Sequence, residues 1–520
     1  MNKRNKFLSV FLSFILLFSV ACQDSSDSEA NISEEDSEVT EDLSQGESQQ
    51  GGSVILGITQ EPDSFDPHLA AAAGTKEIIY NFFDGLVKLM PDSTFEPALA
   101  ESYDVSDDAK IFTFKIRENV TFHNGKELTV DDVVYSLENA AGINDGTLKV
   151  PQLSIIDSVE ADPEQNEVSV TLKESDADFI TYMTLAIVPE DYSEQATEPI
   201  GTGPFVFTEY QPQQHVKMEK NENYWRERIA YLDEVTFLIV PSADAAIVDL
   251  QAGNIDIFPY LTADKKDLLK DQYNFVTADS NMVQVWGLNN QEEPFDDPIV
   301  RKAMDMAVDK QMIVEAVTFG EGKVLESGMA PSMGQYYNSN LESQYNPEEA
   351  KKLLEENGYS DLNITITVPG NYVIHVQTAE VIAENLDAIG VQADIKSVDW
   401  GTWLSDVFQG RNHQSTVIAL TFDHVAPATV LSYYYSPSDM NFINYSNPEF
   451  DALFEEAQSI TNEDQRVKLY HEMQQMLQTD AASVFIQNPG VQTAISKKLG
   501  GYTTYPQYVQ DMYEVYFVAE

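Results

Sequence analysis

The stretch at residues 98–137 constrains the fold more than any other part of the sequence, because its local structure is predictable residue by residue. Apolar and polar side chains alternate over residues 111–116, and this period of two predicts a half-buried strand. Residues 120–122 predict the start of a second strand. Asn124 and Gly125 follow, and both tolerate the positive φ of a tight turn. The first half of the stretch therefore predicts strands that lead into a turn.

A helix is predicted to follow this turn. Thr129 is a typical N-cap, and Asp131 and Asp132 lie in the first turn, where exposed N–H groups and the helix dipole favour negative charge. Val133 and Leu137 recur at helical spacing, as side chains that face a core do. Strands followed by an amphipathic helix occur in many folds, so this unit alone indicates mixed α/β structure and no function.

Several segments, read in order, match one protein family. Residues 99–137 read LAESYDVSDDAKIFTFKIRENVTFHNGKELTVDDVVYSL, a pattern that resembles the signature region of the family 5 extracytoplasmic solute-binding proteins. These are the oligopeptide- and dipeptide-binding lipoproteins of ABC importers. The segments EPDSFDPHL at residues 61–69 and GTGPF at residues 201–205 resemble the same family. The resemblance runs from about residue 57 to the end of the chain without a large insertion.

The resemblance implies an α/β, two-lobed fold of the periplasmic-binding-protein type II, with an extra subdomain in the first lobe. Strand patterns that alternate with helical patterns predict the α/β class independently. The crossing of the chain between lobes comes from the resemblance alone. The implied parts are lobe I at residues 53–84, 198–285 and 488–520, its inserted subdomain at residues 85–197, and lobe II at residues 286–487.

The N-terminus follows the plan of a secreted lipoprotein. A charged start and a short apolar run end at Cys22, and residues 19–22 resemble a lipobox, although Ser19 stands where leucine is usual. Residues 1–22 are therefore predicted to be a lipoprotein signal peptide, with Cys22 as the lipidated residue. An ordinary signal peptide that is cut nearby is the alternative. Residues 23–52 are rich in Ser, Glu, Asp and Gln, and predict a disordered acidic tether on the extracytoplasmic face of the cell membrane.

The charge balance limits the partners of this chain. With 86 acidic and 30 basic residues the formal net charge is −56, which argues against nucleic acid and anionic lipid surfaces as partners. Cys22 is the only cysteine in the sequence, so the folded part is predicted to hold no disulfide and no cysteine nucleophile.

No catalytic motif stands out in the sequence. The seven histidines show no metal-ligand spacing such as H-E-x-x-H, and there is no G-x-S-x-G elbow and no Walker P-loop. We therefore expect no enzymatic activity, no cofactor and no metal site. An anchored secreted hydrolase that uses acidic residues is the alternative from another class, because carboxylate pairs are frequent throughout so acidic a chain.

The resemblance supplies the ligand-binding candidates. The segment at residues 423–431 resembles the family's D-Y-x-x-P-x-x-x-L motif, in which the aspartate, here Asp423, holds the α-amino group of a bound peptide. Trp400 resembles the tryptophan that lines a ligand side-chain pocket, while Trp403 is predicted to be a core residue. Trp286 is a candidate for the cleft or for the core. His424 is a candidate for ligand or metal-chelate contact, or for an exposed loop position.

The sequence departs from the family's oligopeptide binders at two places. Some of them carry an acid a few residues after D-P-H, whereas residues 69–73 here are Leu and Ala only. Residues 416–422 lack the Arg and Trp of the best-known oligopeptide binder. Both differences leave the proposed amine contact of Asp423 in place.

The function implied is that of a membrane-anchored substrate-binding protein. It would capture di- or oligopeptides between two lobes and deliver them to ABC permease subunits for import, as a monomer. The same fold binding another solute, such as a nickel chelate or an oligosaccharide, is the nearest alternative.

Overall fold

The structure is a computed structural model that describes residues 47–422, 424–505 and 507–519. The predicted signal peptide, Cys22, residues 23–46 of the predicted tether and Asp423 lie outside the described residues. In the described part of the chain, no helix is both long and apolar enough to cross a membrane.

Lobe I is built on a sheet that has seven strands in the described part of the chain. Its central strand β2 pairs in parallel with β11 on one side and β12 on the other, and both faces of the centre are buried, as is usual for parallel strands. In spatial order the strands are β13 (Tyr273–Ala278), β20 (Val491–Ser496), β12 (Ile257–Leu261), β2 (Ser53–Ile58), β11 (Glu234–Ile239), β10 (His215–Lys220) and β9 (Phe205–Gln211).

Lobe II is built on a second sheet, which has six strands in the described part of the chain. Its strands β14 and β19 are buried along nearly their whole length, because helices and loops cover both faces. In spatial order the strands are β15 (Lys323–Val324), β19 (Ser483–Asn488), β14 (Met282–Leu288), β18 (Ser415–Thr421), β16 (Asn363–Pro369) and β17 (Gln392–Val398).

The chain passes between these two sheets twice, at residues 279–281 and at residues 489–490. Asn488 joins the two crossings, because its side-chain oxygen accepts from the Ser280 N–H at 3.0 Å and its amide donates to the Ser280 carbonyl at 2.9 Å. The predicted boundary after residue 285 needs correction, since it falls inside β14, which belongs wholly to the lobe II sheet.

An antiparallel sheet forms the inserted subdomain. Its order is β5 (Ala100–Val105), β6 (Ile111–Ile116), β8 (Glu167–Leu172) and β7 (Ile156–Asp162), and the helices α2 (Val130–Ala141) and η1 (Pro151–Ile155) accompany it. The predicted strand at residues 111–116 is confirmed, with Phe112 and Phe114 buried. The predicted N-cap is confirmed as well: Thr129 forms a reciprocal capping box with Asp132.

The predicted strand at residues 120–122 is wrong. Only an isolated bridge joins Thr121 to Glu127 there, across the turn at Gly125, whose φ is 82°.

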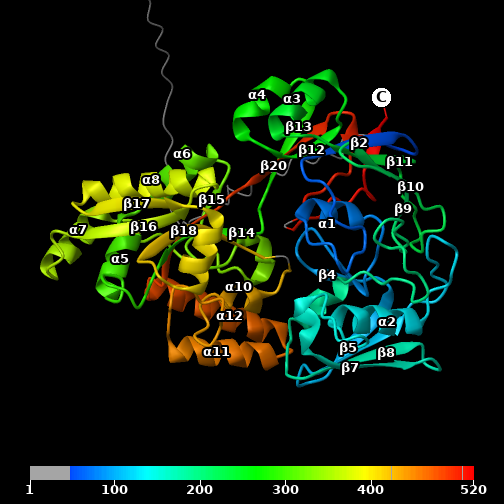
Figure 1. Cartoon of the computed structure of the whole chain (residues 1–520), viewed down its shortest axis with the longest axis horizontal. Helices are drawn as coiled ribbons and strands as arrows, with labels where there is room; N and C mark the ends of the chain where they lie inside the picture. Colours follow the sequence, from blue (N-terminus) through cyan, green and yellow to red (C-terminus); the bar gives the residue numbers. More distant parts are fainter. Residues whose placement is uncertain (1–46, 423, 506, 520) are drawn as a thin grey trace, which may run out of the picture. The chain divides into compact units, whose positions relative to one another are not determined.

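Most of the helices lie in lobe II. The long helix α8 covers β16, β17 and β18, and Figure 1 shows it across this part of the sheet. The lobe I helices are α1 (Ala73–Ile79), α3 (Ala243–Ala252), α4 (Lys266–Leu269), η2 (Phe179–Thr184) and η3 (Ala263–Lys265). The lobe II helices are α5 (Pro298–Ala307), α6 (Lys310–Thr318), η4 (Pro331–Tyr336), α7 (Pro347–Glu356), α8 (Val373–Ala388), α9 (Trp400–Thr402), η5 (Trp403–Gln409), α10 (Pro427–Leu431), α11 (Pro448–Ser459) and α12 (Glu463–Thr479).

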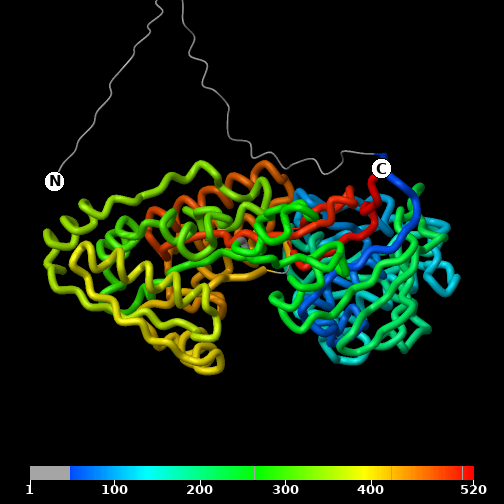
Figure 2. The backbone as a smooth tube through the Cα atoms, turned by 90° about the horizontal axis from the view of Figure 1, so that it is seen from above, coloured from blue at the N-terminus to red at the C-terminus, as the bar shows by residue number. Residues whose placement is uncertain are grey.

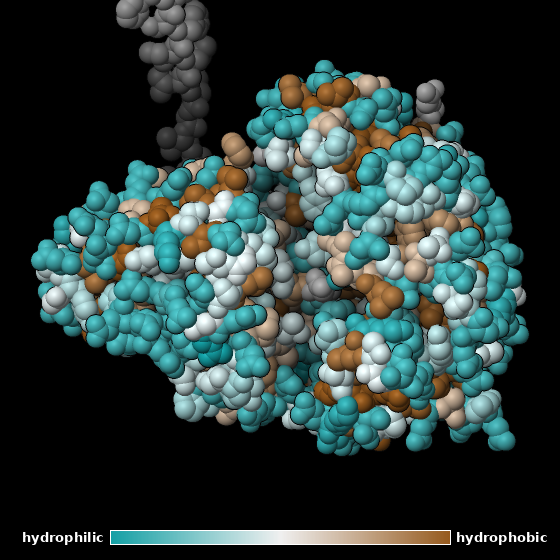
Figure 3. Space-filling model, viewed as in Figure 1, coloured by the Kyte–Doolittle hydropathy of each residue, from teal (hydrophilic) through white to brown (hydrophobic). Residues whose placement is uncertain are grey.

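Two small sheets complete the described chain. β3 (Val87–Leu89) pairs with β4 (Phe95–Pro97), and β22 (Tyr516–Val518) lies between β1 (Ser48–Gln49) and β21 (Leu499–Gly500). The C-terminal segment therefore lies beside the first described residues, as Figure 2 shows. Hydrophilic residues cover most of the face drawn in Figure 3. The two-lobed α/β class that the sequence predicted is confirmed.

Candidate functional site

A cavity of about 550 Å³ lies where lobe I meets the start of the α10 segment of lobe II. This volume is within the range of about 300–1,000 Å³ that is typical of ligand sites. Most of its wall comes from lobe I: the loop after β2, the helix α1, the strand β3, residues 149–152 and the end of η2. His424 and Val425 supply the lobe II side among the described residues, and residues 507–509 line the cavity as well.

The charged residues that line the cavity are mostly basic, whereas the chain as a whole is strongly acidic. Among the described residues, Lys76, Lys88 and Lys149 line the cavity, whereas Asp84 is the one acid. The carboxylate of Asp84 already has hydrogen-bond partners within lobe I. It accepts from the indole N–H of Trp225 at 2.9 Å and from the hydroxyls of neighbouring residues. Lysines therefore outnumber acids among the described lining residues.

Lys149 is held by a chain of hydrogen bonds across the subdomain boundary. Its Nζ donates to Oδ1 of Asn139 at 2.6 Å, and Nδ2 of Asn139 donates to Nδ1 of His68 at 3.4 Å. Nε2 of His68 donates to the Ala186 carbonyl at 2.9 Å, which places the ring proton on Nε2. Burial lowers the pKa of His68, so the ring is neutral at pH 7.

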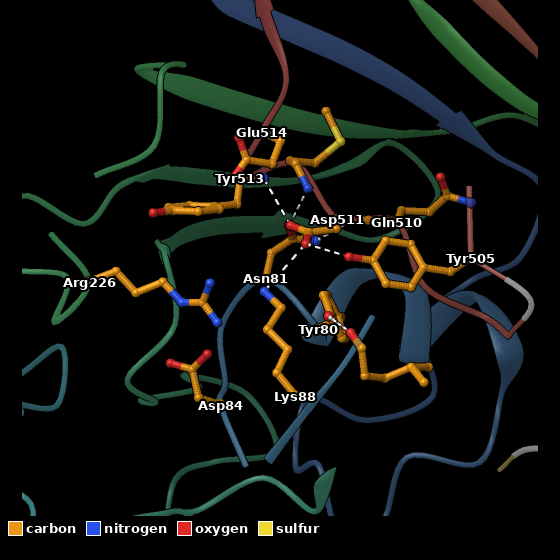
Figure 4. Close-up of polar contacts among 12 residues, drawn as sticks. Tyr80, Asn81, Asp84, Lys88, Arg226, Tyr505, Gln510, Asp511, Tyr513 and Glu514 are labelled. Carbon is orange, nitrogen blue, oxygen red and sulfur yellow. Dashed lines mark hydrogen bonds and ion pairs between the residues drawn. The ribbon is translucent and has the colours of Figure 1, made fainter. Parts of the chain in front are cut away.

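Lys88 is fixed by the C-terminal segment. Its Nζ lies 3.3 Å from Oδ2 of Asp511 and 4.8 Å from the ring centroid of Tyr80. Asp511 also accepts from the Tyr505 hydroxyl at 3.0 Å and from the Tyr513 N–H at 3.0 Å, and Figure 4 shows these groups gathered around its carboxylate. Burial raises the pKa of Asp511, but Lys88 and these donors outweigh burial and hold it below its ordinary value. The charge of Lys88 is thus balanced within lobe I.

Two lining residues carry polar atoms without a hydrogen-bond partner among the described residues. The hydroxyl oxygen of Thr181 is buried, and Thr181 as a whole is 4% exposed. Both amide atoms of Gln507 are also buried and unpartnered. Buried polar groups are nearly always hydrogen-bonded, so these unpartnered atoms beneath the cavity wall are exceptions to the rule.

The ligand candidates from the sequence are placed at three different locations. His424 lines the cavity, and its ring meets that of Tyr182 edge to face, with centroids 5.1 Å apart. Trp400 is 37% exposed on lobe II, and it stacks on Trp403 at 5.1 Å. Neither Trp400 nor Trp286 is among the described lining residues. Asp423, which precedes His424, lies outside the described residues.

Trp286 is a core residue, and its place among the ligand candidates is corrected on this ground. It is 0% exposed in the lobe II core, with its ring against Phe295 at 6.1 Å. A strand buried on both faces leaves its side chains no surface to offer a ligand. Trp403 is 3% exposed, so its predicted core position is confirmed.

The lining lysines, Thr181 and Gln507 were not predicted from the sequence. They come from separate segments, and nothing in their local pattern marks them. The uncharged opening segment that departs from some oligopeptide binders does reach the cavity, since Leu69, Ala70 and Ala71 line it. Among the described residues, no group of His, Cys, Asp or Glu side chains is arranged to hold a metal ion.

Comparisons with known proteins show which proteins this chain resembles. The chain is 28% identical to the oligopeptide-binding protein AppA of Bacillus subtilis over 99% of this chain and 98% of that protein. It is 29% identical to the heme-binding protein A of Haemophilus influenzae over 89% of this chain and 92% of that protein. The crystal structure of Bacillus subtilis AppA in complex with a nonapeptide matches with a TM-score of 0.70 and 26% identity, covering 91% of this chain and 100% of that one.

The sequence profile of the bacterial extracellular solute-binding proteins, family 5, matches residues 94–442, which is more than half of the chain. The relatives above are binding proteins by name, and the resemblance noted in the sequence pointed to the same family. The chain therefore belongs to the family 5 bacterial extracellular solute-binding proteins of ABC importers, and it is a binding protein rather than an enzyme.

Proposed function

We propose that this protein captures peptides in the cavity between lobe I and His424 and delivers them to the permease subunits of an ABC importer. The cavity of about 550 Å³, with walls from both lobes, is the observation that carries the proposal. A relative of similar length, Bacillus subtilis AppA, was crystallised with a nonapeptide, which supports peptides as the ligand class.

The proposed contacts begin at Asp423. Its neighbour His424 lines the cavity, so a carboxylate at residue 423 would pair with the α-amino group of a peptide near this wall. His424, held edge to face against Tyr182, would bound the same end of the ligand. Trp400 remains a proposed contact for a ligand side chain, because its ring is partly exposed and rigidly stacked on Trp403.

The proposed mechanism is closure of the lobes on the ligand. The two crossings at residues 279–281 and 489–490, tied together by Asn488, are short segments of the kind that act as hinges. A peptide would favour the closed form only by the difference in its affinity for the closed and open forms. The closed form would then dock on the permease.

We further propose that the protein is a monomer, anchored through Cys22 on the extracytoplasmic face of the cell membrane. Support comes from the apolar run that ends at the only cysteine of the sequence. The acidic residues up to position 52 would hold the folded part away from the membrane.

Native mass spectrometry of protein produced from the full chain, followed by denaturing release, tests the proposed ligand. We expect co-purified peptides in the wild-type protein and their loss in Asp423→Ala. Heme, a nickel chelate or an oligosaccharide in place of peptides would contradict peptide capture and assign the cavity to that solute. Peptide fragments produced from added peptides would contradict a pure binding function.

A further inference from the structure

The charge of the cavity wall is opposite to that of the whole chain. Acidic residues outnumber basic ones by 86 to 30 in the sequence, yet three lysines and a single acid are found among the described lining residues. The acid, Asp84, is occupied by donors from lobe I, and Lys88 is balanced by Asp511. Lys149, in contrast, forms no ion pair with a carboxylate among the described residues.

Lys149 has a defined position but no counter-ion. Its backbone N–H donates to the Ala140 carbonyl at the end of α2 at 3.0 Å, and its Nζ donates to the neutral amide of Asn139 at 2.6 Å. No carboxylate among the described residues forms an ion pair with it. An ammonium group that is held in a cavity wall without a counter-ion has two N–H donors left for a ligand anion.

The surroundings of Lys149 are polar as well. Gln152, three residues further along the same segment, lines the cavity. Thr181 and Gln507 line the same cavity from η2 and from the C-terminal segment. A carboxylate only accepts hydrogen bonds and pairs strongly with an ammonium, so the Lys149 side of the cavity matches an anionic oxygen group.

We propose that Lys149 binds a carboxylate of the ligand, so that the protein selects peptides that carry an acidic group beside the inserted subdomain. This inference rests on the proposed peptide function and adds the substrate class: peptides with an acidic side chain, or with a free C-terminus, that reaches Lys149.

The test uses isothermal titration calorimetry with protein produced from the full chain. The probes are the tripeptides Ala-Glu-Ala and Ala-Gln-Ala, each as the free acid and as the C-terminal amide, together with hexapeptides that carry Glu or Gln at each internal position. We expect the wild-type protein to bind carboxylate-bearing probes at least about tenfold more tightly than their amide counterparts, the scale of one charge-assisted hydrogen bond.

Lys149→Gln is the informative variant, because its amide still donates to Asn139 and keeps the chain of hydrogen bonds to His68. We expect it to lose the discrimination while it still binds the amide probes, and we expect Lys149→Arg to keep the discrimination. Lys173→Gln is the matched control. Lys173 belongs to the same subdomain, is exposed, donates to the Ser154 carbonyl at 2.7 Å and does not line the cavity.

The outcomes separate this inference from the proposed function. Loss of the Glu-over-Gln preference in Lys149→Gln assigns the carboxylate to a side chain, and loss of the acid-over-amide preference assigns it to the C-terminus. Equal binding of all probes by the wild-type protein, or unchanged discrimination in Lys149→Gln, overturns the inference and leaves peptide binding intact. If no probe binds, peptide capture itself fails and the inference falls with it.

Discussion

Nη2 of Arg466 lies 2.8 Å from Oδ1 of Asp178, and this ion pair joins α12 of lobe II to the inserted subdomain of lobe I. Oδ1 takes part in no hydrogen bond among the described residues, so the contact is an ion pair. Oδ2 of Asp178 accepts from the Tyr470 hydroxyl at 3.1 Å and from the Ala428 N–H at 3.2 Å, both in lobe II. The charged side chains are 10% and 4% exposed, so this pair holds the two lobes together away from water.

Asp178→Asn should weaken ligand binding without a change in the cavity wall. Removing one partner of a buried ion pair costs about 3–5 kcal/mol. Here the loss destabilises the form of the protein in which α12 of lobe II contacts the inserted subdomain of lobe I. The apparent affinity is reduced by the fraction of protein in the binding-competent form. We expect the Kd for a co-purified peptide to rise at least about tenfold in calorimetric titration.

Glu349→Gln provides the matched control for this prediction. Glu349 pairs with Lys352 on the surface of α7, where both side chains are about half exposed at 48% and 58%, and such pairs contribute little. An equal loss of affinity in both variants would show that Asp178 acts through overall charge and not through the contact between lobes.

Glu77 should make stability depend on pH. It is 2% exposed in α1, and burial raises its pKa to about 7, although the Tyr260 hydroxyl and Gln510 stabilise the charged form. The folded state therefore holds this proton over the pH range between the ordinary value of 4.5 and about 7, where the unfolded chain releases it. The contribution of Glu77 to the free energy of unfolding is therefore fully present below pH 4.5, and it is lost as the pH rises from 4.5 through about 7.

Urea unfolding at pH 5 and at pH 8 measures this effect. We expect the wild-type protein to lose about 2–3 kcal/mol more between these pH values than Glu77→Gln does. Glu101→Gln, at an exposed position on β5, should behave like the wild-type protein. The same pH dependence in Glu77→Gln as in the wild-type protein would refute the assignment.

Gly490 should tolerate no side chain. It lies in the second crossing between the lobes, and a Cβ at this position would come within 2.1 Å of the Glu321 carbonyl oxygen. Relief requires a backbone shift, and overpacking of this kind costs about 1–3 kcal/mol. Gly490→Ala is expected to lower the free energy of unfolding by this amount, while Gly401→Ala, where a Cβ would meet only Asp399 at 3.2 Å, should have little effect. Equal stability of the two variants would count against a fixed crossing.

Thr129 should contribute to the stability of the inserted subdomain. Its hydroxyl and its backbone N–H both donate to the Asp132 carboxylate, at 2.8 Å and 3.0 Å. Loss of an N-cap of this kind costs about 1 kcal/mol, so Thr129→Ala should be destabilised by that amount and Thr129→Ser by much less. Thermal unfolding of the three proteins checks the order, and a Thr129→Ser variant as unstable as Thr129→Ala would contradict the capping role.

Local elements were predictable because their signals are local. The period of two in β6 and the N-cap of α2 each depend on residues that are neighbours in sequence. The strand expected at residues 120–122 failed, because strand propensity does not reveal whether a partner strand is present. The two-lobed arrangement came from the family resemblance and not from periodicity.

The candidate site was much less predictable. Lys88 and Asp511 stand more than four hundred residues apart in the sequence, and they meet only because the C-terminal segment returns to lobe I. His68, Asn139 and Lys149 come from three separate segments whose convergence has no local signal. The family resemblance did indicate His424, whereas it could not distinguish a core position from a cleft position for Trp286.

A crystal structure of the protein with Ala-Glu-Ala tests the central claim most directly. The account predicts that the peptide occupies the cavity between lobe I and His424, with its amine at residue 423 and a carboxylate beside Lys149. A peptide bound outside this cavity, or a cavity that holds no peptide at millimolar concentration, would contradict it.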